Sequence, residues 1–202
     1  MAKSEDKQKE IEKLALQAQK GDSAAFGKLY DIFAESIYRY VFFRVSNEQD
    51  AADLTETVFL KAWENLHQYR AVRLRRTQAH TNSSPTNSFS AWIFRIAHNL
   101  VIDHYRLGKQ IEELTEDYMD ERVGHHPIEK AEQALSSDNL KRALTGLKEN
   151  YRQIIVLKYI NDLSNEEIAD VLKKNEGSVR ILQFRALKAL KKILEEMGVT
   201  GF

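Results

Sequence analysis

The segment from residue 163 to residue 190 constrains the fold more than any other part of the chain. Ser164 and Glu167 have the spacing of a capping box, which satisfies the first free backbone donors of a helix. A short apolar face follows, and residues 173–177 then interrupt it. Apolar residues return at helical spacing beyond this break, with five Lys or Arg and no acid among residues 177–192. We therefore predict two short helices joined by a tight turn, which is a helix-turn-helix.

The second of these helices would be apolar on one side and cationic on the other. Such a helix suits the phosphate backbone of DNA, and the helix-turn-helix places it in the major groove. Most charge runs, however, are solvated surfaces without a partner. The capped helix and the turn in front of it favour DNA binding over that alternative.

Helical spacing dominates the rest of the chain, where strand alternation is nearly absent and only Pro85 and Pro127 interrupt. The pattern predicts an all-α protein with two small helical domains, at residues 1–109 and 134–202, joined by an acidic linker at 110–133. Within the first domain we expect an initial helix over residues 11–19 and a polar insertion at 70–87. Three residues are predicted to cap its later helices: Asp22, Asn47 and Ser88.

Charge is balanced overall, with 30 Lys or Arg against 30 Asp or Glu, but it is segregated along the chain. Residues 70–109 contain seven Lys or Arg and one Asp, a net charge of +6. Residues 111–138 contain two Lys or Arg and nine Asp or Glu, a net charge of −7. This alternation predicts two cationic DNA-facing modules with an acidic strap between them.

The chain has no cysteine, which excludes disulfides and thiolate metal sites. No signal-like segment and no apolar run long enough for a membrane span is present, so we expect a cytoplasmic protein without a membrane span. The six histidines form no HExxH motif or spaced cluster with acids. We accordingly expect no catalytic residues, no metal and no cofactor, and hence no enzyme.

Three segments, in this order, carry a resemblance to a known family: DAADLTETVFLKAW at residues 50–63, FSAWIFRIAHNLVIDHYR at 89–106, and LSNEEIADVLKKNEGSVRILQFRALKAL at 163–190. They resemble the core-polymerase-binding helix, the minus-10 recognition helix and the minus-35 helix-turn-helix of extracytoplasmic-function bacterial RNA polymerase sigma factors, which belong to the sigma-70 family. GDSAAFGKLYDIF at residues 21–33 looks like the family's usual opening. The resemblance implies sigma domains 2 and 4 and a function in promoter recognition, promoter melting and transcription initiation.

The implied partners are core RNA polymerase, through its β′ coiled coil and β subunit, and promoter DNA, both double-stranded and melted. An anti-sigma factor is a further candidate. Acids and apolar residues of the 50–63 helix would form the core-polymerase-binding site, because charge steers the encounter and aromatic area supplies affinity. Helix-dipole complementarity is an alternative explanation for the first acid. The residues are Asp50, Asp53, Leu54, Glu56, Phe59 and Trp63.

The resemblance assigns minus-10 DNA binding to polar residues of the 89–106 helix, where Asn and His can hydrogen-bond an extruded base and Arg can hold phosphates. For His98 an ordinary exposed helix residue is an equal alternative. These residues are Arg95, His98, Asn99, Asp103 and Arg106.

Minus-35 DNA binding is assigned by the same resemblance to side chains that can contact guanine, a thymine methyl group or phosphate. These are Ser178, Arg180, Ile181, Phe184, Arg185 and Lys188.

The insertion at 70–87 carries Arg73, Arg75 and Arg76, which predict an extra phosphate clamp, with a disordered decoration as the alternative. By resemblance the acidic linker threads the polymerase channel, and a solvated spacer fits its composition nearly as well.

Two rival functions remain. An autonomous helix-turn-helix regulator would share the C-terminal motif but leave the two earlier segments unexplained. A DNA-processing enzyme would need a carboxylate cluster for a metal ion, for which Asp50, Asp53 and Glu56 are the only candidates.

Overall fold

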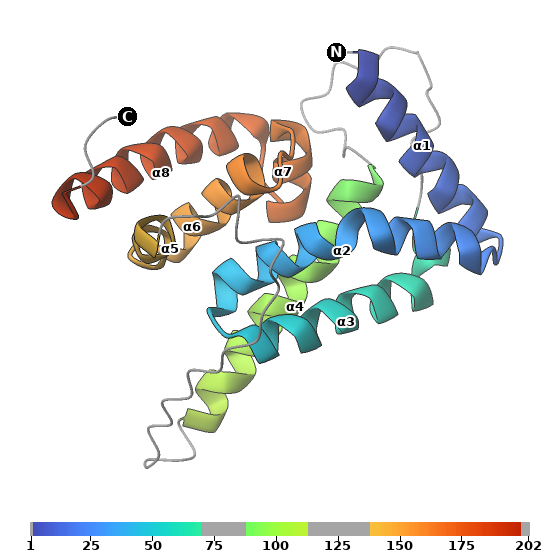
Figure 1. Ribbon diagram of the computed structural model, residues 1–202, viewed down its shortest axis with the longest axis horizontal. Helices are drawn as coiled ribbons and strands as arrows, with labels where there is room; N and C mark the ends of the chain where they lie inside the picture. The colour runs from blue at the N-terminus through green and yellow to red at the C-terminus, as the bar shows by residue number, and fades with distance from the viewer. Residues whose placement is uncertain (1, 70–87, 113–137, 199–202) are drawn as a thin grey trace.

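A computed structural model describes residues 2–69, 88–112 and 138–198, and every regular element within these ranges is helical (Figure 1). The insertion at 70–87 and nearly all of the predicted linker lie outside the described residues. The N-terminal group comprises α1 (Ala2–Gln19), α2 (Ser23–Val45), α3 (Glu48–Glu64), the 3-10 turn η1 (Leu66–Gln68) and α4 (Phe89–Glu112). The C-terminal group comprises α5 (Asp138–Thr145), α6 (Glu149–Ile155), the π-helical turn η3 (Val156–Ile160), α7 (Asn165–Leu172) and α8 (Glu176–Glu196).

The helices begin where the sequence predicts a cap. Asp22 accepts a hydrogen bond from the Ala25 N–H at 3.0 Å, and Asn47 accepts one from the Asp50 N–H at the same distance. Ser88 Oγ likewise accepts from the Ala91 N–H at 3.0 Å. At α7 both bonds of the predicted capping box are present, between Ser164 and Glu167. These four predictions are confirmed.

Three helix boundaries differ from the prediction. α1 begins at Ala2 rather than at residue 11, because residues 2–10 are good helix formers without the apolar spacing that would reveal them. α4 continues to Glu112, into the first residues of the predicted linker. α8 begins at Glu176, within the predicted break, because Asn175 caps it by accepting from the Ser178 N–H at 2.8 Å.

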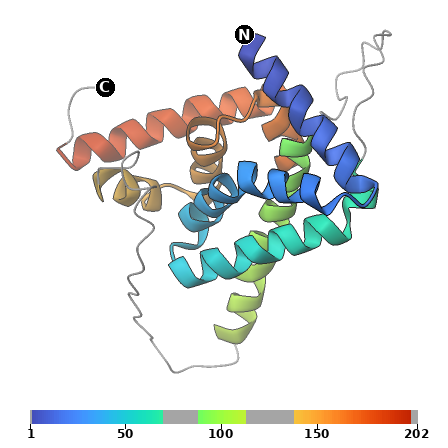
Figure 2. The ribbon, with the colours of Figure 1, turned by 45° about the vertical axis from the view of Figure 1, so that its right-hand side comes forward.

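The two groups of helices pack against each other (Figures 1 and 2). α2 lies between α1 and α3 and also contacts α4, while α7 packs on α4 and α6 approaches α2. The buried apolar residues form one continuous core, which includes Phe94 on α4 and Ile168 on α7. No helix within the described ranges is both long and apolar enough to cross a membrane. The predicted all-α fold is therefore observed, with α4 in contact with α7 of the helix-turn-helix.

Candidate nucleic-acid and partner interfaces

α3 presents an acidic surface with an apolar end. Asp53, Glu56 and Trp63 are exposed, whereas Leu54 is half-buried beside them. Asp50 is also half-buried, and one of its carboxylate oxygens lies 3.7 Å from Nε2 of His104 on α4. The acidic residues of α3 therefore do not form one continuous exposed row, because Asp50, the first of them, lies toward His104 of α4.

Phe59, predicted as part of this surface, is not at the surface in this arrangement, because its side chain is only 5% exposed. Its ring lies beneath that of Tyr30 on α2, with the ring centroids 4.6 Å apart. Trp63 packs edge-on against Phe26, also on α2, at 4.9 Å. The exposed apolar area therefore comes from Tyr30, Leu60 and Trp63, of which the sequence pattern singled out only Trp63 as a contact. We call these three residues together with Asp53 and Glu56 the α3 surface.

The five predicted minus-10 residues divide into two sets on α4. Asn99, Asp103 and Arg106 are exposed, and the Arg106 guanidinium lies 3.5 Å from the Asp103 carboxylate. Arg95 and His98 are half-buried on the side that packs against α7. Burial raises the pKa of Asp170 on α7, and the charge of nearby Arg95 partly offsets that shift.

His98 belongs to a polar cluster between the two groups of helices rather than to an open face. The Tyr40 hydroxyl lies 3.1 Å from Nδ1 of His98, and the same hydroxyl oxygen accepts a hydrogen bond from Arg44 Nη1 at 2.8 Å. Burial lowers the pKa of His98 to about 4, and the charges of Arg44 and Lys173 act in the same direction. His98 is consequently neutral at pH 7 and can accept the hydroxyl hydrogen of Tyr40. In this arrangement His98 is therefore half-buried rather than an ordinary exposed helix residue.

Arg44, at the end of α2, is the centre of this cluster and is only 3% exposed. It forms an ion pair with Glu149 of α6, and its Nη1 donates to Oε1 of Gln153 at 3.4 Å. The Tyr105 hydroxyl on α4 donates to the Arg44 carbonyl. A buried guanidinium needs such partners because an unpaired charge in the interior is very costly. No local pattern in the sequence predicts this role, since the partners lie far apart along the chain.

A second polar link joins the beginnings of α4 and α7. Ser88 Oγ donates to Oε1 of Glu167 at 2.8 Å, while Oε2 of Glu167 accepts from the Ser164 N–H at 2.9 Å. One carboxylate therefore connects the first turn of α4 to the capping box of the helix-turn-helix.

α8 leaves the predicted minus-35 residues largely open. Arg180, Ile181, Phe184, Arg185 and Lys188 are exposed, whereas Ser178 is half-buried. Phe184 is 71% exposed and Ile181, three residues earlier, is 55% exposed, so two large apolar side chains lie open on the same part of α8. Gln183, which lies between them, donates to Asn165 of α7 at 2.8 Å and so holds the two helices of the motif together.

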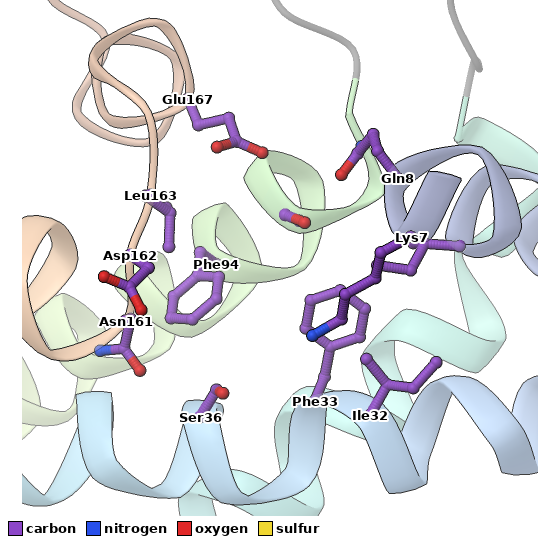
Figure 3. A pocket seen from close by; sticks show the side chains of 12 residues that line it. Lys7, Gln8, Ile32, Phe33, Ser36, Phe94, Asn161, Asp162, Leu163 and Glu167 are labelled. Carbon is purple, nitrogen blue, oxygen red and sulfur yellow. The ribbon is translucent and has the colours of Figure 1, made fainter. Parts of the chain in front are cut away.

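A cavity of about 210 Å³ opens where α1, α2 and α4 meet the segment before α7 (Figure 3). Lys7, Phe33, Phe94 and Asp162 are among the residues that line it. Within the described part of the chain, no three His, Asp or Glu side chains gather as a metal site would require. The rival hypothesis of a metal-dependent enzyme thus finds no cluster among these residues.

Comparisons with known proteins show which class of protein the chain is similar to. The family described as "Sigma-70, region 4" matches residues 137–190, which contain the helix-turn-helix. The ECF RNA polymerase sigma factor BldN of Streptomyces coelicolor is 34% identical over 91% of this chain, which spans 65% of BldN. SigW of Bacillus subtilis, another ECF RNA polymerase sigma factor, is 29% identical, with 93% of this chain and 98% of SigW covered.

A solved structure of CnrH in complex with the cytosolic domain of CnrY has a similar fold. Its TM-score is 0.66 at 25% identity, with 93% of this chain and 98% of CnrH covered. RpoE of Bartonella quintana, solved with the anti-sigma factor NepR, gives a TM-score of 0.65 at 20% identity over 84% of this chain and 96% of RpoE, and shows the same fold. The chain is thus similar to sigma factors of the sigma-70 family. More narrowly, it is similar to the extracytoplasmic-function RNA polymerase sigma factors.

Proposed function

We propose that this protein binds core RNA polymerase, recognises promoter DNA at two elements and promotes its melting, without catalysing a reaction itself. The main support is α8, which presents Arg180, Ile181, Phe184 and Arg185 to solvent on the second helix of a sigma region 4 motif. An exposed ring and aliphatic side chain between two arginines fit the edges of bases in a major groove. Bacterial cytoplasm, where core polymerase works, would be its site of action.

The α3 surface is the proposed contact for core polymerase. Its acids can steer a cationic partner such as the β′ coiled coil, and the apolar area of Tyr30, Leu60 and Trp63 can anchor it. These rings rest on Phe26 and Phe59, which hold them in place from beneath. The surface is therefore rigid before the partner arrives, which lowers the entropic cost of binding.

We propose that α4 is the helix that recognises the minus-10 element. Asn99, Asp103 and Arg106 are accessible in the packed arrangement, whereas α7 covers the side that carries Arg95 and His98. If Arg95 is to reach DNA, the C-terminal group must move away from α4. We expect binding to polymerase to separate the two groups, which then act as sigma domains 2 and 4 on the two promoter elements.

An anti-sigma factor is a further proposed partner. The structural relative RpoE was solved with one, and CnrH was solved in complex with the cytosolic domain of CnrY. A protein that held the two groups of helices together would keep Arg95 and His98 covered.

Reconstitution with core polymerase tests the proposed function. We expect the full chain to co-elute with core polymerase and to direct initiation from a cognate promoter. Asp53→Lys should weaken this association at least about tenfold, because it places a cation in an acidic docking surface. Glu10→Lys is the matched control, since it makes the same charge change at an exposed position on α1. Equal binding by the Asp53→Lys variant and the parent would remove the α3 surface from the proposal.

Promoter binding tests the role of α8. Arg180→Ala or Arg185→Ala should cost roughly 1–3 kcal/mol at one minus-35 base pair if the guanidinium binds guanine in two places. A contact to phosphate alone would instead weaken all sequences alike and reduce the salt dependence of binding. Lys191→Ala is a control, because Lys191 is exposed farther along α8 and lies 3.8 Å from Glu195.

A further inference from the structure

Glu12 on α1 contacts two positions that flank residues 70–87. Its Oε2 accepts a hydrogen bond from the Tyr69 hydroxyl, and its Oε1 accepts from the Phe89 backbone N–H at 3.1 Å. Gln8, one turn earlier on α1, donates to the same Oε1 at 3.0 Å and lines the cavity of Figure 3. Both carboxylate oxygens are thus engaged, and they join the segment after α3 to the first residue of α4.

The groups that Glu12 holds are buried and tightly packed. Tyr69 is 2% exposed and Phe89 is fully buried. The Tyr69 ring lies edge-on to Phe89 at 5.4 Å and also packs against Trp92 at 5.5 Å. Gln19, at the end of α1, donates to the carbonyl of Tyr69 at 2.8 Å and to that of Leu66 at 2.9 Å. α1 therefore fixes this junction from two points.

The chemistry of the contact favours a carboxylate. The first N–H groups of a helix have no partner within the helix, and the helix dipole makes its N-terminus attractive to negative charge. Ser88 satisfies the Ala91 N–H, and Glu12 satisfies that of Phe89 from a separate helix. Hydrogen bonds to an ionised acceptor are about twice as strong as those between neutral groups. Burial raises the pKa of Tyr69, and the hydrogen bond to Glu12 and its charge raise it further, so the hydroxyl remains a donor.

A second carboxylate, that of Glu167, also reaches the beginning of α4 through Ser88. Glu167 lies on α7, however, and would leave with the C-terminal group when the two groups separate on a promoter. Glu12 belongs to the N-terminal group and would stay. The direction of α4 in the open state would then depend on Glu12 and on the packing around Phe89.

We propose that Glu12 is a positioning residue for promoter opening: it sets the first turn of α4 through the Phe89 N–H and the Tyr69 hydroxyl, so that Asn99 and Arg106 meet the melted strand in the correct place. This inference rests on the proposed function of α4. α1 thereby acquires a role in DNA melting although none of its residues need contact DNA. Small displacements of contacting groups have large effects on such steps because the contacts are short-ranged.

The test uses holoenzyme assembled from core polymerase and the full chain carrying Glu12→Gln or Tyr69→Phe. A glutamine has one acceptor oxygen and no charge, so it cannot accept from Tyr69 and Phe89 with two ionised oxygens as Glu12 does, whereas phenylalanine keeps the ring packing and loses only the hydroxyl. Glu10→Gln is the matched control, since it removes the same charge from an exposed position of α1. The readout is the ratio of open promoter, from permanganate reactivity of bubble thymines, to total bound promoter.

We expect both variants to lower this ratio about three- to tenfold, the size of one ordinary hydrogen bond, while the control matches the parent. Core binding and minus-35 duplex binding should be unchanged. A purely structural role would reduce the amount of holoenzyme but not the open fraction of what is bound. An unchanged ratio in both variants, or an equal loss in the control, would overturn the inference while the parent still opens promoters. A parent that opens none would overturn the proposed function and this inference with it.

Discussion

The neutral state of His98 makes the stability of the protein depend on pH. Its pKa is lowered from 6.5 to about 4 by burial and by the charges of Arg44 and Lys173. Between these values the unfolded chain binds a proton that the folded chain does not bind. The free energy of unfolding should therefore fall as the pH drops from about 6.5 to about 4, and it should be fully retained above that range.

The expected loss is roughly 1–3 kcal/mol after allowance for the partial exposure of the ring. Urea unfolding at several pH values measures it. The carboxylates of the protein titrate in the same range, so the comparison is with His98→Gln, which keeps a partner for the Tyr40 hydroxyl and does not titrate. A pH dependence as steep in this variant as in the parent would show that His98 is not responsible.

The exposure and the contacts of single side chains were the hardest features to predict from the sequence. Helical spacing places Phe59 on the same side of α3 as Glu56 and Trp63, but Tyr30 of a different helix covers it. His98 shares the polar side of α4 with Asn99, yet its partner Tyr40 is 58 residues away. The sequence contains the identity of each side chain, and exposure is decided by which distant helix packs against it.

At the scale of elements, helix starts were predictable because the bonds that define them are local. Asp22, Asn47, Ser88 and Ser164 each bind a backbone N–H three residues further along. Side chains of this kind accept from the free donors of the first turn whatever the surrounding fold. The boundary at the start of α1 was missed because its first residues lack an apolar face.

The start of α8 gives a prediction for this scale. Asn175 accepts from the Ser178 N–H, so Asn175→Ala should lower the free energy of unfolding by about 1 kcal/mol. Asn175→Asp should retain most of the stability, because its carboxylate can cap the helix and also suits the helix dipole. Denaturant unfolding of both variants would decide the matter, and equal stability of Asn175→Ala and the parent would mean that the cap contributes nothing measurable.

At the scale of the whole molecule, the polar contacts between the two groups of helices bear on the proposed separation. Arg44 pairs with Glu149, and Ser88 pairs with Glu167, next to an apolar contact between α4 and α7. Removing one partner of a buried ion pair is strongly destabilising because the other charge is left uncompensated. Arg44 must therefore gain water or another partner when the groups part. Sequence patterns identified both groups but gave no indication of this contact, which depends on residues more than 70 positions apart.

Glu149→Lys should consequently shift the free chain toward separated groups. It opposes the Arg44 guanidinium with a second cation, and 46% of the Glu149 side chain is exposed, so a lysine can be accommodated without a clash.

The chain has no cysteine, so single cysteines introduced at exposed Lys13 on α1 and Lys174 after α7 allow specific dye labelling. We expect energy transfer between the dyes to fall in Glu149→Lys and to remain at the parent value in Glu166→Lys, which makes the same charge change at an exposed position on α7. The variant with lower transfer should also bind a single-stranded minus-10 oligonucleotide more tightly, because the side of α4 that carries Arg95 becomes accessible. Lower transfer without tighter binding would show that α7 does not limit access to α4, and unchanged transfer would show that the Arg44–Glu149 pair does not hold the groups together.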